Sequence, residues 1–116
     1  MILNEEATIK SHDRYEIQFQ CFDDNNEPAD LTGATVRLLS RPRYPGGSAT
    51  MELSIKEIEY NIGIITHMLD GSMDDPNTYE IEVEATRADT GEITTYPNKQ
   101  KSGKKYVLLK VNPDLG

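Results

Sequence analysis

The chain has 116 residues, 36% of them hydrophobic, and its 20 acidic and 12 basic side chains give a net charge of −8. This length supports one domain that can bury a working core without disulfides or metal. The acidic balance argues against nucleic acid and against anionic membranes as partners, because both attract concentrated positive charge.

The first clear strand follows a weakly patterned arm. Residues 1–13 are expected to be flexible or to dock on a neighbour, although Ala7–Lys10 fits a short edge strand. Apolar and polar side chains then alternate from Arg14 to Phe22, which predicts a strand with one buried face. The side chains expected to face inward are Tyr15, Ile17, Phe19 and Cys21. Because Cys21 is the only cysteine, it has no partner for an internal disulfide and is interpreted as a small buried hydrophobe.

Turn residues divide the middle of the chain into further short strands. Asx, Gly and Pro residues break a strand because they favour local turns. The predicted turns are Asp23–Pro28, Asp30–Gly33 and the loop 41–48, which contains Arg41 and Arg43. The predicted strands are Ala34–Leu39, Thr50–Ile55 with an extension through Ile58 and Tyr60, and Ile64–Leu69.

The strongest strand signal is Tyr79–Ala85, where apolar side chains alternate with Glu80, Glu82 and Glu84. One face of this strand is expected to be buried and the other to carry a row of solvated carboxylates, which is typical of antiparallel sheets. A turn at residues 88–92 predicts a hairpin with a strand over Ile93–Tyr96. The last predicted strand is Tyr106–Val111, after a basic segment.

These signals predict a single all-β domain over residues 1–116. About seven strands are expected, with turn signals every ten residues or so and no sustained helical period. This profile is typical of an immunoglobulin-like antiparallel β-sandwich.

The residues that invite a catalytic interpretation are better explained structurally. Ser11, His12 and Asp13 are adjacent, and neighbouring side chains point apart, whereas a catalytic triad must converge in space. His67 is expected near the solvated face of its strand. We therefore predict no catalytic residues, no cofactor and no enzymatic activity.

Metal binding is not predicted either. The acidic turn Asp23–Glu27 lacks the glycine and the distal glutamate of a calcium loop, and no Cys/His spacing fits zinc. A weak cation site would require this turn to meet a second acidic loop at one end of the sandwich. That loop contains Asp70, Asp74 and Asp75.

Two clusters of opposite charge are the candidate partner-contact residues. The row of glutamates is interpreted either as a solvated face that discourages aggregation or as a docking face for a basic partner. The opposite cluster is either a solvated loop or a contact to the acidic face of a neighbour, and such head-to-tail contacts generate rings. The two clusters are Glu80, Glu82 and Glu84, and Lys99, Lys101, Lys104 and Lys105.

Several segments occur in a distinctive order. They are Phe22–Pro28, Asp30–Val36, Gly63–Ile65 and Thr78–Val83, followed by Pro97 ahead of the last strand. From about residue 10 to 112 this order resembles the immunoglobulin-like N-terminal domain of phage baseplate upper proteins and related phage and prophage tail modules.

The resemblance implies a non-enzymatic structural or assembly module of a phage or prophage tail, baseplate or neck. It also implies a virion location after assembly in the bacterial cytoplasm, with other virion proteins and the chain itself as partners. We expect neither a signal peptide nor a transmembrane segment. Baseplate proteins of this kind continue into a coiled coil and a receptor-binding region that residues up to Gly116 do not contain, so we expect the structural role.

The alternative is a carbohydrate-binding sandwich that recognises a glycan of the host cell surface. Such sites usually display exposed aromatic side chains. The candidates here are Tyr44, Tyr60 and Tyr96.

Overall fold

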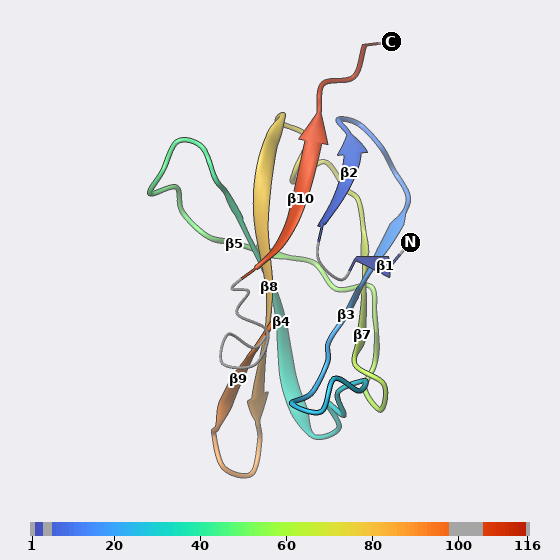
Figure 1. Ribbon diagram of the computed structural model, residues 1–116, viewed down its shortest axis with the longest axis vertical. Coiled ribbons are helices and arrows are strands. Elements are labelled where there is room, and N and C mark those ends of the chain that lie inside the picture. The colour runs from blue at the N-terminus through green and yellow to red at the C-terminus, as the bar shows by residue number, and fades with distance from the viewer. Residues whose placement is uncertain (1, 4–5, 98–105, 116) are drawn as a thin grey trace.

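Two β-sheets pack face to face in the computed structural model, which describes residues 2–3, 6–97 and 106–115 (Figure 1). The described residues form strands, turns and loops and contain no helix, so no helix there could cross a membrane. The all-β sandwich predicted from the hydropathy pattern is confirmed. The strands are β1 (Ile2–Leu3), β2 (Glu6–Lys10), β3 (Glu16–Gln20), β4 (Ala34–Pro42), β5 (Met51–Leu53), β6 (Glu57–Glu59), β7 (Ile64–Met68), β8 (Asn77–Arg87), β9 (Ile93–Tyr96) and β10 (Val107–Asn112).

The strand order is that of an immunoglobulin-like sandwich. One sheet has the order β1-β3-β7-β6, and the other has the order β2-β10-β8-β4-β5 with β9 also paired to β8. Strands β3, β7 and β6 therefore take the places of B, E and D, while β4, β8 and the pair β9/β10 take those of C, F and G. Two pairs are parallel, β1 with β3 and β2 with β10, and the other pairs are antiparallel.

Strand β8 is the centre of the six-stranded sheet. Along one edge it pairs with β4 from Tyr79, opposite Pro42, to Arg87, opposite Ala34. Its other edge is shared, because β10 pairs with the first half of β8 and β9 with the second half. The long alternating segment is therefore held on both sides, which positions its outward carboxylates on a broad sheet face.

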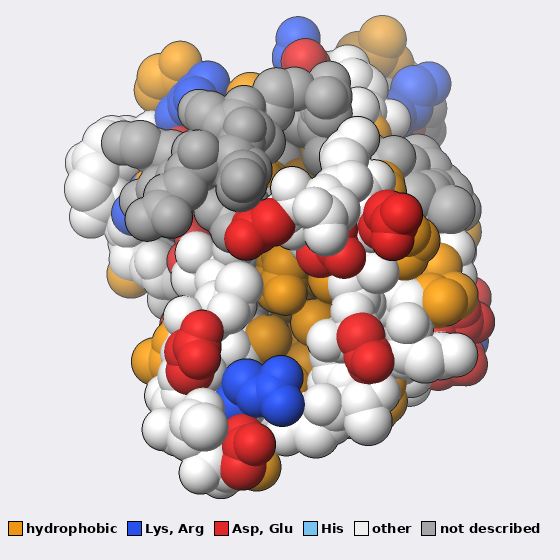
Figure 2. All heavy atoms as spheres, turned by 60° about the horizontal axis from the view of Figure 1, so that its bottom comes forward, with side chains coloured by type: hydrophobic (Ala, Val, Ile, Leu, Met, Phe, Trp, Pro, Cys, Tyr) orange, Lys and Arg blue, Asp and Glu red, His pale blue; other side chains and the backbone are white. Residues whose placement is uncertain are grey.

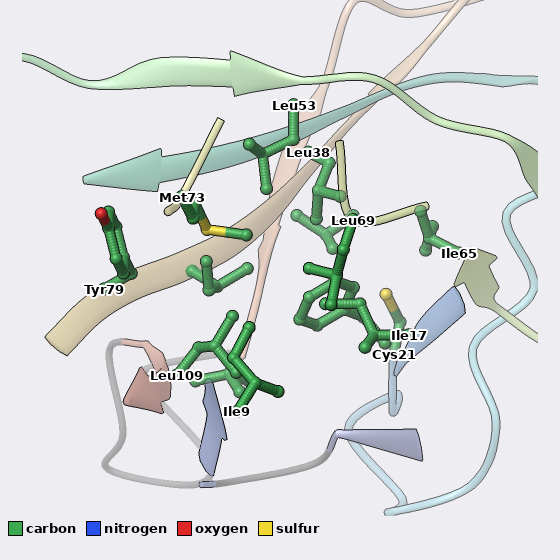
Figure 3. Close-up of a cluster of buried hydrophobic side chains, with 14 of the residues drawn as sticks. Ile9, Ile17, Cys21, Leu38, Leu53, Ile65, Leu69, Met73, Tyr79 and Leu109 are labelled. Atoms are coloured by element: carbon green, nitrogen blue, oxygen red, sulfur yellow. The ribbon is translucent and has the colours of Figure 1, made fainter. Parts of the chain in front are cut away.

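The inner faces of the two sheets form a single core (Figure 3). The inward residues of β8 are buried as predicted, with Ile81 1% exposed and Val83 3% exposed. Ile17 and Ile65 approach them from the four-stranded sheet. Burying each such aliphatic side chain stabilises the fold by about 1.5–3 kcal/mol. Cys21 is also buried, as predicted, and burial raises the pKa of its thiol to about 12.

The number of strands exceeds the predicted seven because the chain forms several very short ones. Strand β1 has 2 residues, and β5 and β6 have 3 residues each. Such elements are too short for a hydropathy period to develop. The predicted edge strand at Ala7–Lys10 is confirmed as β2, which lies parallel to β10.

Two side chains lie on a face other than the one predicted. Tyr15 was expected in the core but is 39% exposed, because β3 begins only at Glu16 and does not hold Tyr15 in its alternation. His67 was expected near the solvated face but is fully buried. Because the side chains of a strand alternate between its two faces, His67 lies on the inner face with Ile65. The Nδ1 atom of His67 lies 2.7 Å from the Ser54 carbonyl oxygen.

Two element boundaries also differ from the prediction. Ile58 does not extend the strand at residues 50–55, because β5 pairs with β4 whereas β6 pairs with β7 in the opposite sheet. The chain thus crosses between the sheets at residues 54–56. Strand β4 continues to Pro42, so Arg41 belongs to a strand and not to the loop that follows it.

The two acidic loops lie at opposite ends of the sandwich. Strands β3 and β7 are antiparallel, with Glu16 opposite Met68 and Gln20 opposite Ile64. The loops that follow these two strands therefore point in opposite directions, and the shared cation site that would require them to meet does not form. In the described residues no group of three or more His, Cys, Asp or Glu side chains is placed to hold a metal ion.

Candidate docking surface

The outer face of the six-stranded sheet carries the three predicted glutamates, all half-buried and two of them paired with arginines. The Glu80 side chain is 13% exposed and the Glu84 side chain 22% exposed. The expectation of a fully solvated row is therefore wrong at these positions. The cause is the neighbouring strand β4, whose arginines lie directly opposite the glutamates in register.

Glu80 is held by two arginines. Arg41 donates from Nη2 and Nε to Glu80 Oε1 at 2.9 and 3.1 Å, and Arg43 Nε lies 4.0 Å from Glu80 Oε2. The same Arg41 Nη2 lies 3.0 Å from the Tyr106 hydroxyl oxygen, and its Cζ lies 5.4 Å from the centroid of the Tyr106 ring. The hydrogen bond to Glu80, followed by that to Tyr106, raises the pKa of Arg41. This network fixes the guanidinium in one place.

The arginine that pairs with Glu84 also pairs with Glu52 on a third strand. Arg37 lies opposite Glu84, with Nη1 3.2 Å from Glu84 Oε1 and Nε 2.8 Å from Glu52 Oε1 on β5. Arg37 thereby links β8, β4 and β5 across the sheet face. Each of these pairs contributes little to stability, because solvent screens the exposed guanidinium groups, but together they determine where charge is neutralised.

Glu82 differs from its two neighbours because no cation of the described residues faces it. The residue opposite Glu82 on β4 is Leu39. Among the described residues, no ion pair or hydrogen bond is formed by the Glu82 carboxylate. Leu39 points to the outer face, yet it is only 8% exposed. Within the described part of the chain, a half-buried carboxylate therefore stands beside apolar surface without a charge partner.

A hollow of about 190 Å³ lies at this point of the sheet face. It combines an uncommitted carboxylate, a fixed guanidinium–tyrosine pair, a hydroxyl group and apolar surface. The lining residues are Leu39, Ser40, Arg41, Thr50, Glu80, Glu82 and Tyr106.

The predicted basic cluster lies outside the described residues. Lys99, Lys101, Lys104 and Lys105 belong to the segment 98–105, which follows β9 and precedes Tyr106. Its predicted contact with the glutamate face stays a prediction.

Some of the residues that carry the family resemblance lie together at one end of the sandwich, in the turn after β3 and the turn before β7. Gly63, with a φ of 66°, accepts a hydrogen bond from the Cys21 amide at 2.8 Å, and the Ala29 amide donates to the Cys21 carbonyl at 2.9 Å. Asp23 Oδ1 accepts from the amides of Asn25 and Glu27 at 2.9 and 3.0 Å. These contacts hold the turns at this end of the sandwich.

The same end is strongly acidic. Hydrogen bonds from Thr32 lower the pKa of Asp30, and Arg87, at the close of β8, pairs with Asp89 at 3.4 Å. Figure 2 looks onto this end and shows carboxylates surrounding exposed apolar atoms. The exposed acidic residues of its turns are Asp23, Asp24, Glu27, Asp30, Asp89 and Glu92.

The three tyrosines proposed for glycan binding do not share one surface. Tyr44 is 66% exposed and lies at the end of β4, where its amide donates to Asn77 Oδ1 at 3.3 Å. Tyr60 is 44% exposed and accepts from the Leu31 amide at 2.6 Å, beyond the opposite end of β4. Tyr96 packs against the core.

Ser11, His12 and Asp13 make separate contacts and do not converge. The Ser11 hydroxyl donates to the Asp74 carbonyl at 2.5 Å, and Asp13 Oδ2 accepts from the Lys10 amide at 2.9 Å. His12 adopts a positive φ of 69°. The Ser11 hydroxyl and the Asp13 carboxylate are thus committed to different backbone groups.

Sequence reasoning missed the residues that neutralise the glutamates. Arg37, Leu39 and Arg41 alternate along one strand and match the period of the glutamate row. That shared period was the available signal. It identifies partners only when the register of β4 on β8 is known.

Comparison of the chain with protein-family models gave no match, and comparison with curated proteins gave none either. The fold and the chemistry of the sheet face therefore carry the functional argument.

Proposed function

We propose that this chain is a non-enzymatic assembly module of a phage or prophage tail, baseplate or neck. Its partners are other virion proteins and further copies of itself. The module acts by presenting a rigid immunoglobulin-like sandwich whose outer sheet face and charged segments dock on neighbouring subunits.

The observation that carries this proposal is the coherent end formed by the resemblance residues. Gly63 is distant in sequence from Cys21 and Ala29, yet the Cys21 amide donates to the Gly63 carbonyl and the Ala29 amide donates to the Cys21 carbonyl, while Asp23 holds the adjoining turn through its carboxylate. The resemblance to phage tail modules then supplies the biological setting.

The charged sheet face suits a docking role. Arginine–glutamate pairs held in register keep their side chains ordered before any partner arrives, so less conformational entropy is lost on binding. Complementary charge also directs subunits into one orientation and raises the rate of association.

The proposal is tested by following the chain in phage particles. An affinity-tagged copy is expressed in cells that produce the phage or induced prophage encoding it, and particles are separated on a density gradient. We expect the tagged chain to band with intact tails and to be detected there by mass spectrometry in a fixed ratio to other tail proteins.

An untagged strain and a tagged unrelated acidic protein of similar size serve as controls for carry-over. Recovery of the chain only in the particle-free fractions would contradict the proposed role.

A further inference from the structure

The part of the outer sheet face formed by β4, β5 and the middle of β8, with Arg43 just after β4, holds one unbalanced negative charge among the described residues. Its four carboxylates, from Glu52, Glu80, Glu82 and Glu84, face three guanidinium groups, from Arg37, Arg41 and Arg43. The ion pairs account for every one of these groups except Glu82. This part of the face therefore has room for one additional cation, and a second would be repelled by the arginines.

The hollow beside Glu82 has the chemistry to receive a long basic side chain. Leu39 offers apolar surface to a methylene stem, while the Glu82 carboxylate and the Thr50 side chain lie on its lining for a charged head. Its volume of about 190 Å³ is sufficient for a side chain and not for a folded segment. The Arg41–Tyr106 contact forms a fixed wall.

The chain itself carries a suitable donor. Of the eight basic residues in the described ranges, six form ion pairs, which leaves Lys10 and Lys110. The remaining basic residues are the four lysines within positions 99–105. No other stretch of the chain concentrates positive charge in this way.

We propose that the hollow binds one lysine side chain from the 99–105 segment of a second copy of the chain, with the Glu82 carboxylate accepting from the ammonium group. The contact is heterologous, since the hollow and the lysine are different parts of the surface, and it therefore links copies head to tail. This inference rests on the proposed assembly function and names its contact.

The test compares two glutamate variants of the purified full-length chain. Glu82→Gln removes the uncommitted carboxylate, and Glu59→Gln makes the same change in charge on exposed β6 of the other sheet. Association is measured by sedimentation velocity over a concentration series at about 20 mM and about 500 mM salt. We expect Glu82→Gln to weaken association roughly tenfold at low salt and Glu59→Gln to change it less than about twofold.

Charge exchange identifies the donor. Glu82→Lys is expected to abolish association at low salt, as is one of the single variants Lys99→Glu, Lys101→Glu, Lys104→Glu or Lys105→Glu. Combining the two changes in one chain restores head-to-tail contact, because the exchanged charges attract again. Circular dichroism melting of each variant checks that the sandwich is intact.

Several results would overturn the inference. These are a wild-type chain that stays monomeric at all concentrations, equal effects of Glu82→Gln and Glu59→Gln, or failure of every double exchange to restore association. Loss of glycan binding on an array in Glu82→Gln, with self-association intact, would assign the hollow to a sugar instead. Each result is independent of whether the chain bands with phage particles, so failure of the contact and failure of the assembly function are distinguishable.

Discussion

Gly63 occupies a backbone position where a side chain has no room. Its φ is +66°, and a Cβ atom there would lie 2.6 Å from the Ala29 carbonyl oxygen and 3.2 Å from that of Cys21. Left-handed backbone costs an ordinary residue about 1–2 kcal/mol, and the collision with rigid backbone adds to this. The turn that carries part of the family resemblance therefore depends on the absence of a side chain.

Replacing Gly63 by alanine is expected to lower the free energy of unfolding by more than about 2 kcal/mol. Gly91→Ala is the matched control, because Gly91 has a φ of +74° but no atom within 4 Å of its would-be Cβ. It is expected to lose only about 1 kcal/mol. Urea denaturation measures both, and equal losses would show that the collision is relieved by movement.

A second residue-scale prediction concerns Asp74. Arg14 donates to both of its carboxylate oxygens at 2.9 and 2.7 Å, and this hydrogen bonding lowers the pKa of Asp74 to about 2. An aspartate in an unfolded chain has a pKa of about 3.9. The lowered pKa means that the stabilisation is present above about pH 4 and is lost as the pH falls through about 2.

Asp74→Asn is therefore expected to reduce stability at neutral pH, and its difference from the wild type should narrow between about pH 4 and pH 2. Urea midpoints measured across this range test the prediction. Asp75→Asn changes the neighbouring exposed carboxylate and should leave the midpoint unaltered at neutral pH. A wild-type and Asp74→Asn difference that stays constant down to pH 2 would contradict the role given to Arg14.

At the scale of elements, β2 shows that part of the N-terminal arm belongs to the sandwich. Its five residues pair in parallel with β10, and Ile9 is 5% exposed within the core. Thr8, one position earlier, points outward and is exposed. Burial of one face of this strand closes the edge of the core beside Val111.

Ile9→Ala is expected to lower the free energy of unfolding by about 2–4 kcal/mol, because it leaves a cavity. Thr8→Ala should change it by less than about 0.5 kcal/mol. Both values come from urea denaturation at neutral pH. A small effect of Ile9→Ala would mean that β2 contributes little to the folded state in solution.

The alternation of side chains predicted the elements well wherever a strand is long and amphipathic. In β8 it placed Ile81 and Val83 in the core and Glu82 outside. It failed for His67, because a polar residue was expected near the solvated face, whereas its position in the alternation buries the ring. It could not detect that the chain changes sheets after β5, since periodicity says nothing about which strand is the partner.

The candidate docking surface was predicted only in part, because periodicity does not identify which strand is the partner. Local pattern identified the glutamates, but the pairing of Arg37 and Arg41 with them joins residues 47 and 39 positions apart. Register across strands decides such contacts, and a single sequence expresses register only weakly. The distinction between Glu82 and its paired neighbours therefore required the fold.

At the scale of the whole molecule, positive charge is unevenly distributed. Four of the 12 basic residues lie within positions 99–105, which leaves eight basic against 20 acidic residues elsewhere, a net charge of −12. An acidic body with one basic segment repels other copies except where that segment meets a carboxylate. Self-association should then depend on the position of the lysines and not on net charge alone.

Two double variants separate these effects. Lys104→Gln with Lys105→Gln and Lys10→Gln with Lys110→Gln each bring the net charge from −8 to −10. Only the first pair is expected to weaken association, roughly tenfold at low salt, and to flatten its dependence on ionic strength. Light scattering across salt concentrations measures both quantities. Equal weakening in the two variants would attribute association to overall repulsion, and a larger effect of the second pair would move the contact to the β2–β10 edge of the sheet.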